Sequence, residues 1–70
     1  MTRYYFHFRT GSSLVKDEIG EIFADASSAL QHARKIAQEL MQGGEPAGGS
    51  IIVAEGRRDL FEVPLSDQGY

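Results

Sequence analysis

One amphipathic segment occupies the middle of the chain and limits the folds open to it. Apolar residues recur there at helical spacing, and polar residues fill the positions between them. The apolar positions are Ala26, Ala29, Leu30, Ala33, Ile36, Ala37, Leu40 and Met41. Asp25 is a suitable N-cap, and Gly43-Gly44 predicts an end in left-handed geometry. We therefore expect one helix over residues 26–42, with a single apolar face that needs a second layer to pack on.

The chain before this helix has the pattern of a β-hairpin. Tyr4, Phe6 and Phe8 alternate with more polar residues, and aromatic residues with period two are typical of a half-buried strand. We expect a strand over residues 2–9 whose phenylalanine side faces the core. An Asp-x-x-Gly turn at residues 17–20 leads to a second, short strand at residues 21–24.

The chain after the helix predicts a second hairpin. Residues 45–50 form a loop, residues 51–54 are a mostly β-branched run, and residues 56–59 have turn composition. Residues 60–65 alternate again, and Pro64 favours an edge strand because it has no amide hydrogen to donate. The predicted order is thus β-β-α-β-β.

This order predicts an α+β domain of two layers, an antiparallel sheet with one helix packed on one face. Seventy residues are enough for one domain, so we expect residues 1–70 to form a single unit with an ordered core over 2–65 and a polar tail at 66–70. The expected core is Tyr4, Phe6, Phe8, Ile22, Ala29, Leu30, Ala33, Ile36, Ala37, Leu40, Ile51, Val53, Phe61, Val63 and Leu65.

A lone helix covers only one face of the sheet, and the other face carries the first candidate site. The alternation places five residues there that form a possible protein interface: Tyr5, His7, Ile52, Ala54 and Leu60. Adjoining apolar residues on a sheet often mark an interface, and a symmetric homodimer is the commonest closed arrangement. We expect a homodimer or an unidentified protein partner. In the alternative, the tail or residues 11–19 fold over this face and leave a monomer.

The charge balance argues against nucleic acid as a partner. Seven Lys and Arg residues against ten Asp and Glu residues give a net charge of −3. Arg57 and Arg58, in the predicted turn of the second hairpin, form a weak basic contact at most. The chain shows neither a secretory signal nor a membrane-spanning run, so we expect a cytoplasmic protein with no membrane partner.

The residue types also indicate no catalytic constellation. The chain has no cysteine, and its two histidines, His7 and His32, are predicted on elements that do not bring them together. The glycine-rich stretch at residues 43–49 follows a helix C-terminus, whereas phosphate loops precede a helix N-terminus. We therefore expect no cofactor, no metal and no enzymatic activity.

Several segments together resemble a family. The opening run over residues 3–9, the turn at residues 17–20, the alanine-rich helix and the closing hairpin resemble small uncharacterised proteins of rhizobia and related alphaproteobacteria. The resemblance covers residues 3–65, and the Arg-Tyr-Tyr-Phe-His opening is its most specific part. It implies a domain of unknown function with this fold.

The chain is also similar, more weakly, to HicB-type antitoxins. These share the aromatic strand, the Asp-x-x-Gly turn, the alanine-rich helix and a segment like Gly44-Glu45-Pro46. The characteristic proline-rich element before the helix and the C-terminal DNA-binding segment are missing here, so the similarity implies a shared half-fold. Two function hypotheses follow: a small non-enzymatic binding or assembly domain, and an antitoxin-like or regulatory module that binds a specific protein or nucleic-acid partner.

Overall fold

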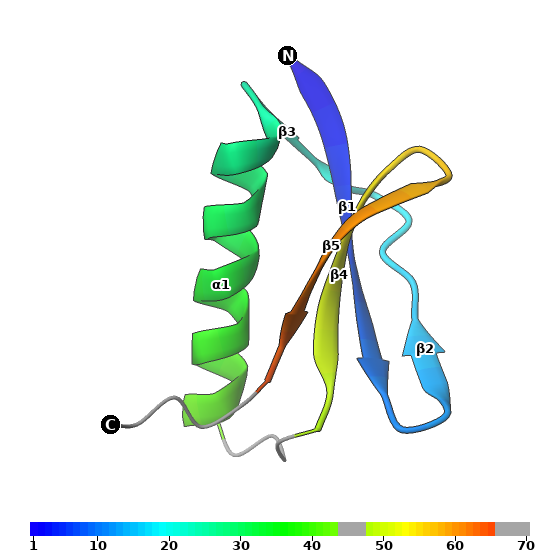
Figure 1. Ribbon diagram of the computed structural model, residues 1–70, viewed down its shortest axis with the longest axis vertical. Helices are drawn as coiled ribbons and strands as arrows, with labels where there is room; N and C mark the ends of the chain where they lie inside the picture. The colour runs from blue at the N-terminus through cyan, green and yellow to red at the C-terminus, as the bar shows by residue number, and fades with distance from the viewer. Residues whose placement is uncertain (44–47, 66–70) are drawn as a thin grey trace.

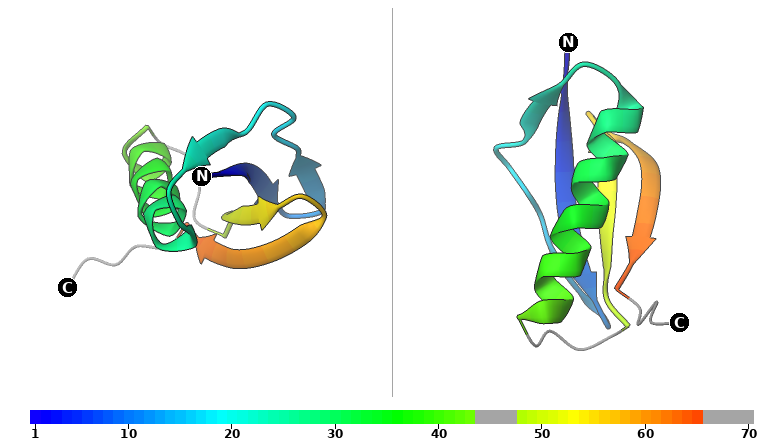
Figure 2. Two further views of the ribbon diagram at one scale, coloured as in Figure 1. Left: turned by 90° about the horizontal axis from the view of Figure 1, so that it is seen from above. Right: turned by 90° about the vertical axis from the view of Figure 1, so that its left-hand side faces the viewer.

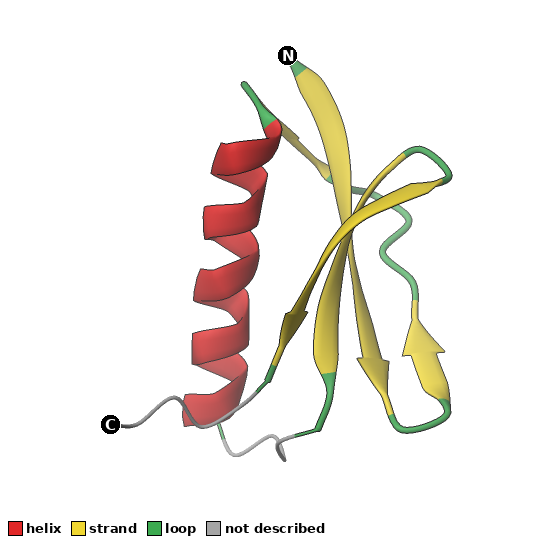
Figure 3. Ribbon diagram, viewed as in Figure 1, coloured by secondary structure: helices red, strands yellow, loops and turns green. Residues whose placement is uncertain are grey.

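A computed structural model of the chain describes residues 1–43 and 48–65. In the described part, five strands and one helix follow one another (Figures 1 and 3). They are β1 (Thr2–Thr10), β2 (Ser13–Val15), β3 (Glu21–Phe23), α1 (Ala26–Gln42), β4 (Ser50–Glu55) and β5 (Arg58–Pro64). The α+β fold with a single helix is confirmed, and the hairpin before the helix contains one more short strand, β2, than the sequence predicts.

The strands form one antiparallel sheet in the order β2-β1-β4-β5, and β3 also pairs with β1. Strand β2 pairs with the C-terminal end of β1, from Phe8 to Thr10, and β3 pairs with its N-terminal end, from Thr2 to Tyr4. Figure 2 shows β3 on the side of β1 that is away from β4. Strands β2 and β3 therefore follow one another along the same edge of β1. Strand β5 forms the opposite edge, as Pro64 predicts.

Helix α1 lies along one face of the sheet (Figure 2). The buried residues of α1 are three alanines one turn apart, Ala29, Ala33 and Ala37, which are 0%, 0% and 6% exposed. Small side chains let the helix approach the sheet, and larger apolar residues such as Ile36 and Leu40 pack at the margins of this stripe. The helix begins as predicted, because the Asp25 carboxylate accepts the Ser28 amide at 2.8 Å.

The sheet face toward the helix is set by the register of the three long strands. Phe6 lies opposite Val53, which lies opposite Phe61, and these three pack in or against the core. The side chains buried to less than 2% exposure include Val53 and Leu65. The alternation in β1 thus places its phenylalanine side on the core, as predicted.

Two members of the predicted core are wrong. Ile22 is 51% exposed, because it pairs with Arg3 and shares the face that points away from the helix, while its neighbour Phe23 packs on the core. Leu30 is only half-buried and lies outside the core cluster. Gly43 is the C-cap of the helix with a φ of −80°, and the predicted left-handed end is untested, because the residue after this cap is Gly44. Gly44, residues 45–47 of the predicted loop and the 66–70 tail lie outside the described residues.

Candidate binding surface

Four of the five predicted interface residues share the sheet face away from α1. Tyr5 pairs with Ala54 and His7 pairs with Ile52, so their side chains point to the same side. Ile52 and Ala54 are only 8% and 1% exposed. Their strand, β4, lies between β1 and β5, whose larger side chains flank them. The expectation that this face is uncovered is therefore wrong for Ile52 and Ala54.

Leu60 lies elsewhere than predicted. A β-bulge between Val53 and Ala54 shifts the β4–β5 register, so that Val53 pairs with Phe61 and Ala54 pairs with Asp59. Leu60 falls between these two pairs and packs against the core cluster. Strict alternation cannot anticipate such an extra residue, which is why the sequence placed Leu60 on the wrong face.

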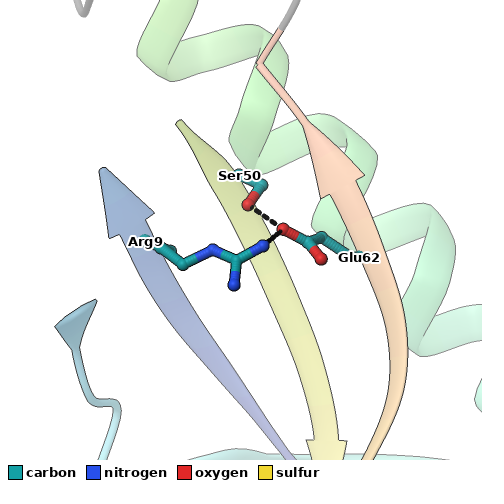
Figure 4. A network of polar contacts seen from close by, with 3 residues as sticks. All are labelled: Arg9, Ser50 and Glu62. Carbon is teal, nitrogen blue, oxygen red and sulfur yellow. Dashed lines mark hydrogen bonds and ion pairs between the residues drawn. The ribbon is translucent and has the colours of Figure 1, made fainter. Parts of the chain in front are cut away.

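A polar network that the sequence does not predict crosses this face where Arg9 pairs with Ser50 (Figure 4). The Arg9 guanidinium donates to Oε2 of Glu62, and the Ser50 hydroxyl donates to the same oxygen at 2.5 Å. The hydrogen bond from Ser50 and the bond from Arg9 hold the pKa of the Glu62 carboxyl below its usual value. The three residues come from β1, β4 and β5, so the network joins three strands and leaves Arg9 paired with a carboxylate.

The two predicted basic residues are exposed beside the β4–β5 turn. Arg57 lies in the turn, and Arg58 opens β5 opposite Glu55. Arg9 pairs with Ser50, at the other end of β4. Arg9 is thus separated from Arg57 and Arg58 by the length of β4.

The segment between β2 and β3 is held on β1 by the Asp17 side chain. Its carboxylate accepts the amides of Phe6, Ile19 and Gly20 at 3.2, 3.1 and 3.1 Å. The Asp17 amide in turn donates to Nδ1 of His7 at 3.0 Å. Asp17 therefore takes the place of a strand residue in the gap between β2 and β3. It also brings part of the 11–19 segment to His7. This contact agrees with the alternative in which that segment folds over the sheet face.

The electrostatics of Asp17 combine two opposing effects. Partial burial raises the pKa of its carboxyl, but the three backbone amides and the nearby His7 outweigh this and lower the pKa below its usual value.

The turn also depends on Gly20, whose φ is +74°. A Cβ there would lie 2.9 Å from both the Tyr4 carbonyl oxygen and the Tyr5 ring.

The exposed apolar surface of the described residues gathers along this same segment. Leu14, Val15, Ile19 and Ile22 are 46%, 61%, 80% and 51% exposed, and together we call them the apolar edge. All four lie on β2, on β3 or on the connection between them. Apart from Met1, at 96%, these are the large hydrophobic residues that the described chain exposes. The charged residues Lys16 and Glu18, also exposed, flank Asp17 in the middle of the edge.

The sequence contains a signal for this edge that the two-hairpin interpretation did not use. The stretch from Leu14 to Ile22 has four large apolar residues that do not alternate with polar ones. Two of its positions, Leu14 and Val15, are adjacent in one strand, so at most one of them can face the core. Apolar residues that cannot all be buried indicate an exposed apolar surface.

The two histidines lie apart, as expected. His7 is on the face away from the helix, while His32 packs from α1 against the rings of Phe6 and Phe23, with centroids 5.1 Å away in each case. Its Nε2 lies 3.4 Å from a carboxylate oxygen of Glu21. His32 is therefore part of an aromatic cluster, although it occupies one of the polar positions between the apolar residues of the helix. Within residues 1–43 and 48–65, no group of three His, Asp or Glu side chains is placed to hold a metal ion.

The arrangement defines a small α+β domain with a polar network across one sheet face and with the apolar edge along β2 and β3. A protein-family model with the description "Domain of unknown function (DUF6894)" matches residues 3–66, and the chain belongs to this family. The predicted membership in a family of unknown function is thereby confirmed. Comparison with curated proteins and with solved structures found no match. In the part of the chain that is described, no helix has the length and apolar character to span a membrane.

Proposed function

We propose that the protein is a small non-enzymatic binding or assembly domain that acts through protein contacts, and that its contact surface is the apolar edge. The observation that carries the proposal is the exposure of four large apolar side chains along one edge of the sheet. Neighbouring exposed apolar residues mark contact sites in proteins more often than isolated ones do. An edge with unpaired backbone groups is also a common docking site for another chain.

Two further observations support a binding role over catalysis or nucleic-acid recognition. His7 and His32 lie on opposite faces of the sheet, so they cannot act together on one substrate. The net charge is −3, and Arg9 is paired with Glu62 while Arg57 and Arg58 lie at the far end of β4. This distribution gives a phosphate backbone no continuous basic surface to follow.

Site-specific photocrosslinking in cells that express the protein tests the proposal. A photoreactive amino acid at position 19, on the apolar edge, is compared with one at position 38, an exposed position of α1. We expect a discrete covalent adduct with a protein from position 19 and none from position 38. An adduct pattern that is the same at both positions, or no adduct from position 19, would contradict the proposed contact surface.

A further inference from the structure

We propose that the partner at the apolar edge is a second copy of this chain. The two copies dock edge to edge in antiparallel orientation, with the two-fold axis beside Asp17. This inference rests on the proposed function, because it names the occupant of the same surface. Three properties of the edge point to a second copy: the spacing of its apolar residues, the face on which they lie and the sign of the charges between them.

The spacing of the edge is symmetric about Asp17. Leu14 pairs with Arg9, Ile22 pairs with Arg3, and the Asp17 carboxylate binds the amide of Phe6. Arg9 and Arg3 are each three residues from Phe6 along β1, so Leu14 and Ile22 lie at equal distances on either side of Asp17. A two-fold axis at this point brings Leu14 of each copy opposite Ile22 of the other. An interface of this kind needs the same patch on both copies, and this patch is complementary to itself.

Leu14 and Ile22 also lie on the same face of the sheet. Their partners Arg9 and Arg3 are an even number of residues apart in β1, so all four side chains point to one side. A two-fold axis perpendicular to the sheet keeps that side common to both copies, so the two side chains can meet. The Phe6 amide points to this edge, so the backbone groups of Arg3 and Arg9, an odd number of residues away, point to β4 instead. Their partners Ile22 and Leu14 are therefore not hydrogen-bonded to them, and the backbone groups of Ile22 and Leu14 point outward, toward a neighbour.

The charges in the middle of the edge follow the same symmetry. Lys16 and Glu18 are exposed on either side of Asp17. The axis places Lys16 of each copy beside Glu18 of the other, which gives two Lys16–Glu18 ion pairs. The next residues outward, Val15 and Ile19, are both exposed and apolar, so apolar side chains flank the charges on both sides. A parallel arrangement would instead place like charges together, which opposes docking.

A charge-exchange experiment tests the second copy directly. In Lys16→Glu protein both contacts become Glu against Glu, and in Glu18→Lys protein both become Lys against Lys. In a mixture of the two variants, a dimer of one copy of each regains two ion pairs between Lys and Glu. We expect sedimentation equilibrium to show wild-type protein with an average mass that rises with concentration toward twice 7.7 kDa. Each variant alone should dissociate about tenfold more readily, and the mixture should recover the wild-type behaviour.

The matched controls are Lys35→Glu and Glu39→Lys, which make the same charge changes at exposed positions of α1. They should leave the mass distribution of the protein unchanged, and circular dichroism should show all four variants folded. Wild-type protein that stays monomeric at every concentration, or a mixture that gains no mass over its components, would overturn the second copy. If position 19 then still crosslinks to a different protein, the proposed function stands without self-association. If it crosslinks to nothing, both proposals fail.

Discussion

At the scale of single residues, Asp17 does most to shape the candidate surface. Its carboxylate binds three backbone amides and fills the gap between β2 and β3, where β1 would otherwise have an unpaired amide at Phe6. The exposed residues on either side, Lys16 and Glu18, are thereby held in fixed positions along the edge. The form of the apolar edge therefore depends on one side chain that is itself turned inward.

Asp17→Asn tests this role. An asparagine can still accept the Ile19 and Gly20 amides, but its NH2 group would then face the Phe6 amide, donor against donor. We expect the free energy of unfolding at neutral pH to fall by about 1 kcal/mol, since the site is partly open to water. The pKa of Asp17 is lowered in the folded state, so the carboxylate stabilises the fold fully at pH values above the ordinary aspartate pKa of 3.8. This contribution is lost as the pH falls through the folded pKa, and the variant should lose less stability over that range.

Urea denaturation as a function of pH measures both effects. Asp59→Asn is the control, because Asp59 is exposed and its side chain makes no hydrogen bond to any described residue. If Asp17→Asn has the same free energy of unfolding as the wild type, and loses it in the same way at low pH, then Asp17 does not hold the segment.

At the scale of elements, the alanine stripe determines how closely the helix approaches the sheet. Ala33 is fully buried at its centre. Replacement of Ala33 by leucine adds three carbon atoms where the packing leaves no room, so the helix must move or the side chain must leave its preferred rotamer. We expect a loss of about 1 to 3 kcal/mol in the free energy of unfolding. Gln38→Leu, at an exposed position of the same helix, should change it by no more than about 0.5 kcal/mol. Thermal unfolding followed by circular dichroism compares them, and equal losses would mean that the assigned helix face is wrong.

The sequence predicts the elements with strong periodicity and fails where local geometry breaks the period. The 26–42 helix has the predicted bounds, because Asp25 caps its start and its apolar positions keep helical spacing. Ile22 and Phe23 are both apolar, so the strand pattern alone cannot show which of them faces the core. Pairing with Arg3 decides it, and that is a long-range contact. Leu60 is displaced by a bulge for which the sequence has no marker.

The candidate surface was predicted only in part, for a related reason. The sequence places Tyr5, His7, Ile52 and Ala54 correctly on one face, but burial depends on the neighbours in three dimensions, and the central strand is covered on both sides. The exposed residues are instead in the irregular segment before the helix. That segment has a turn composition, which predicts a connection, and nothing in it reports that Asp17 fixes the connection to β1.

At the scale of the whole molecule, the sheet has two edges with different character. Strand β5 carries Pro64 and charged residues such as Arg58, Asp59 and Glu62, which discourage pairing with another chain. The opposite edge has no proline and carries Leu14, Val15, Ile19 and Ile22, and its exposed charges Lys16 and Glu18 have opposite signs. Only one edge is therefore protected, so association at the other would give a closed pair instead of an open fibre.

A dilution series followed by NMR of the methyl groups tests this account most directly. The signals of Val15, Ile19 and Ile22 should shift or broaden as the protein concentration rises, because their methyl groups enter the contact. The signals of Ile52 and Val53, which are buried within one copy, should stay constant. Edge signals that do not change over the series, or changes centred on the face that carries Tyr5 and His7, would contradict the account.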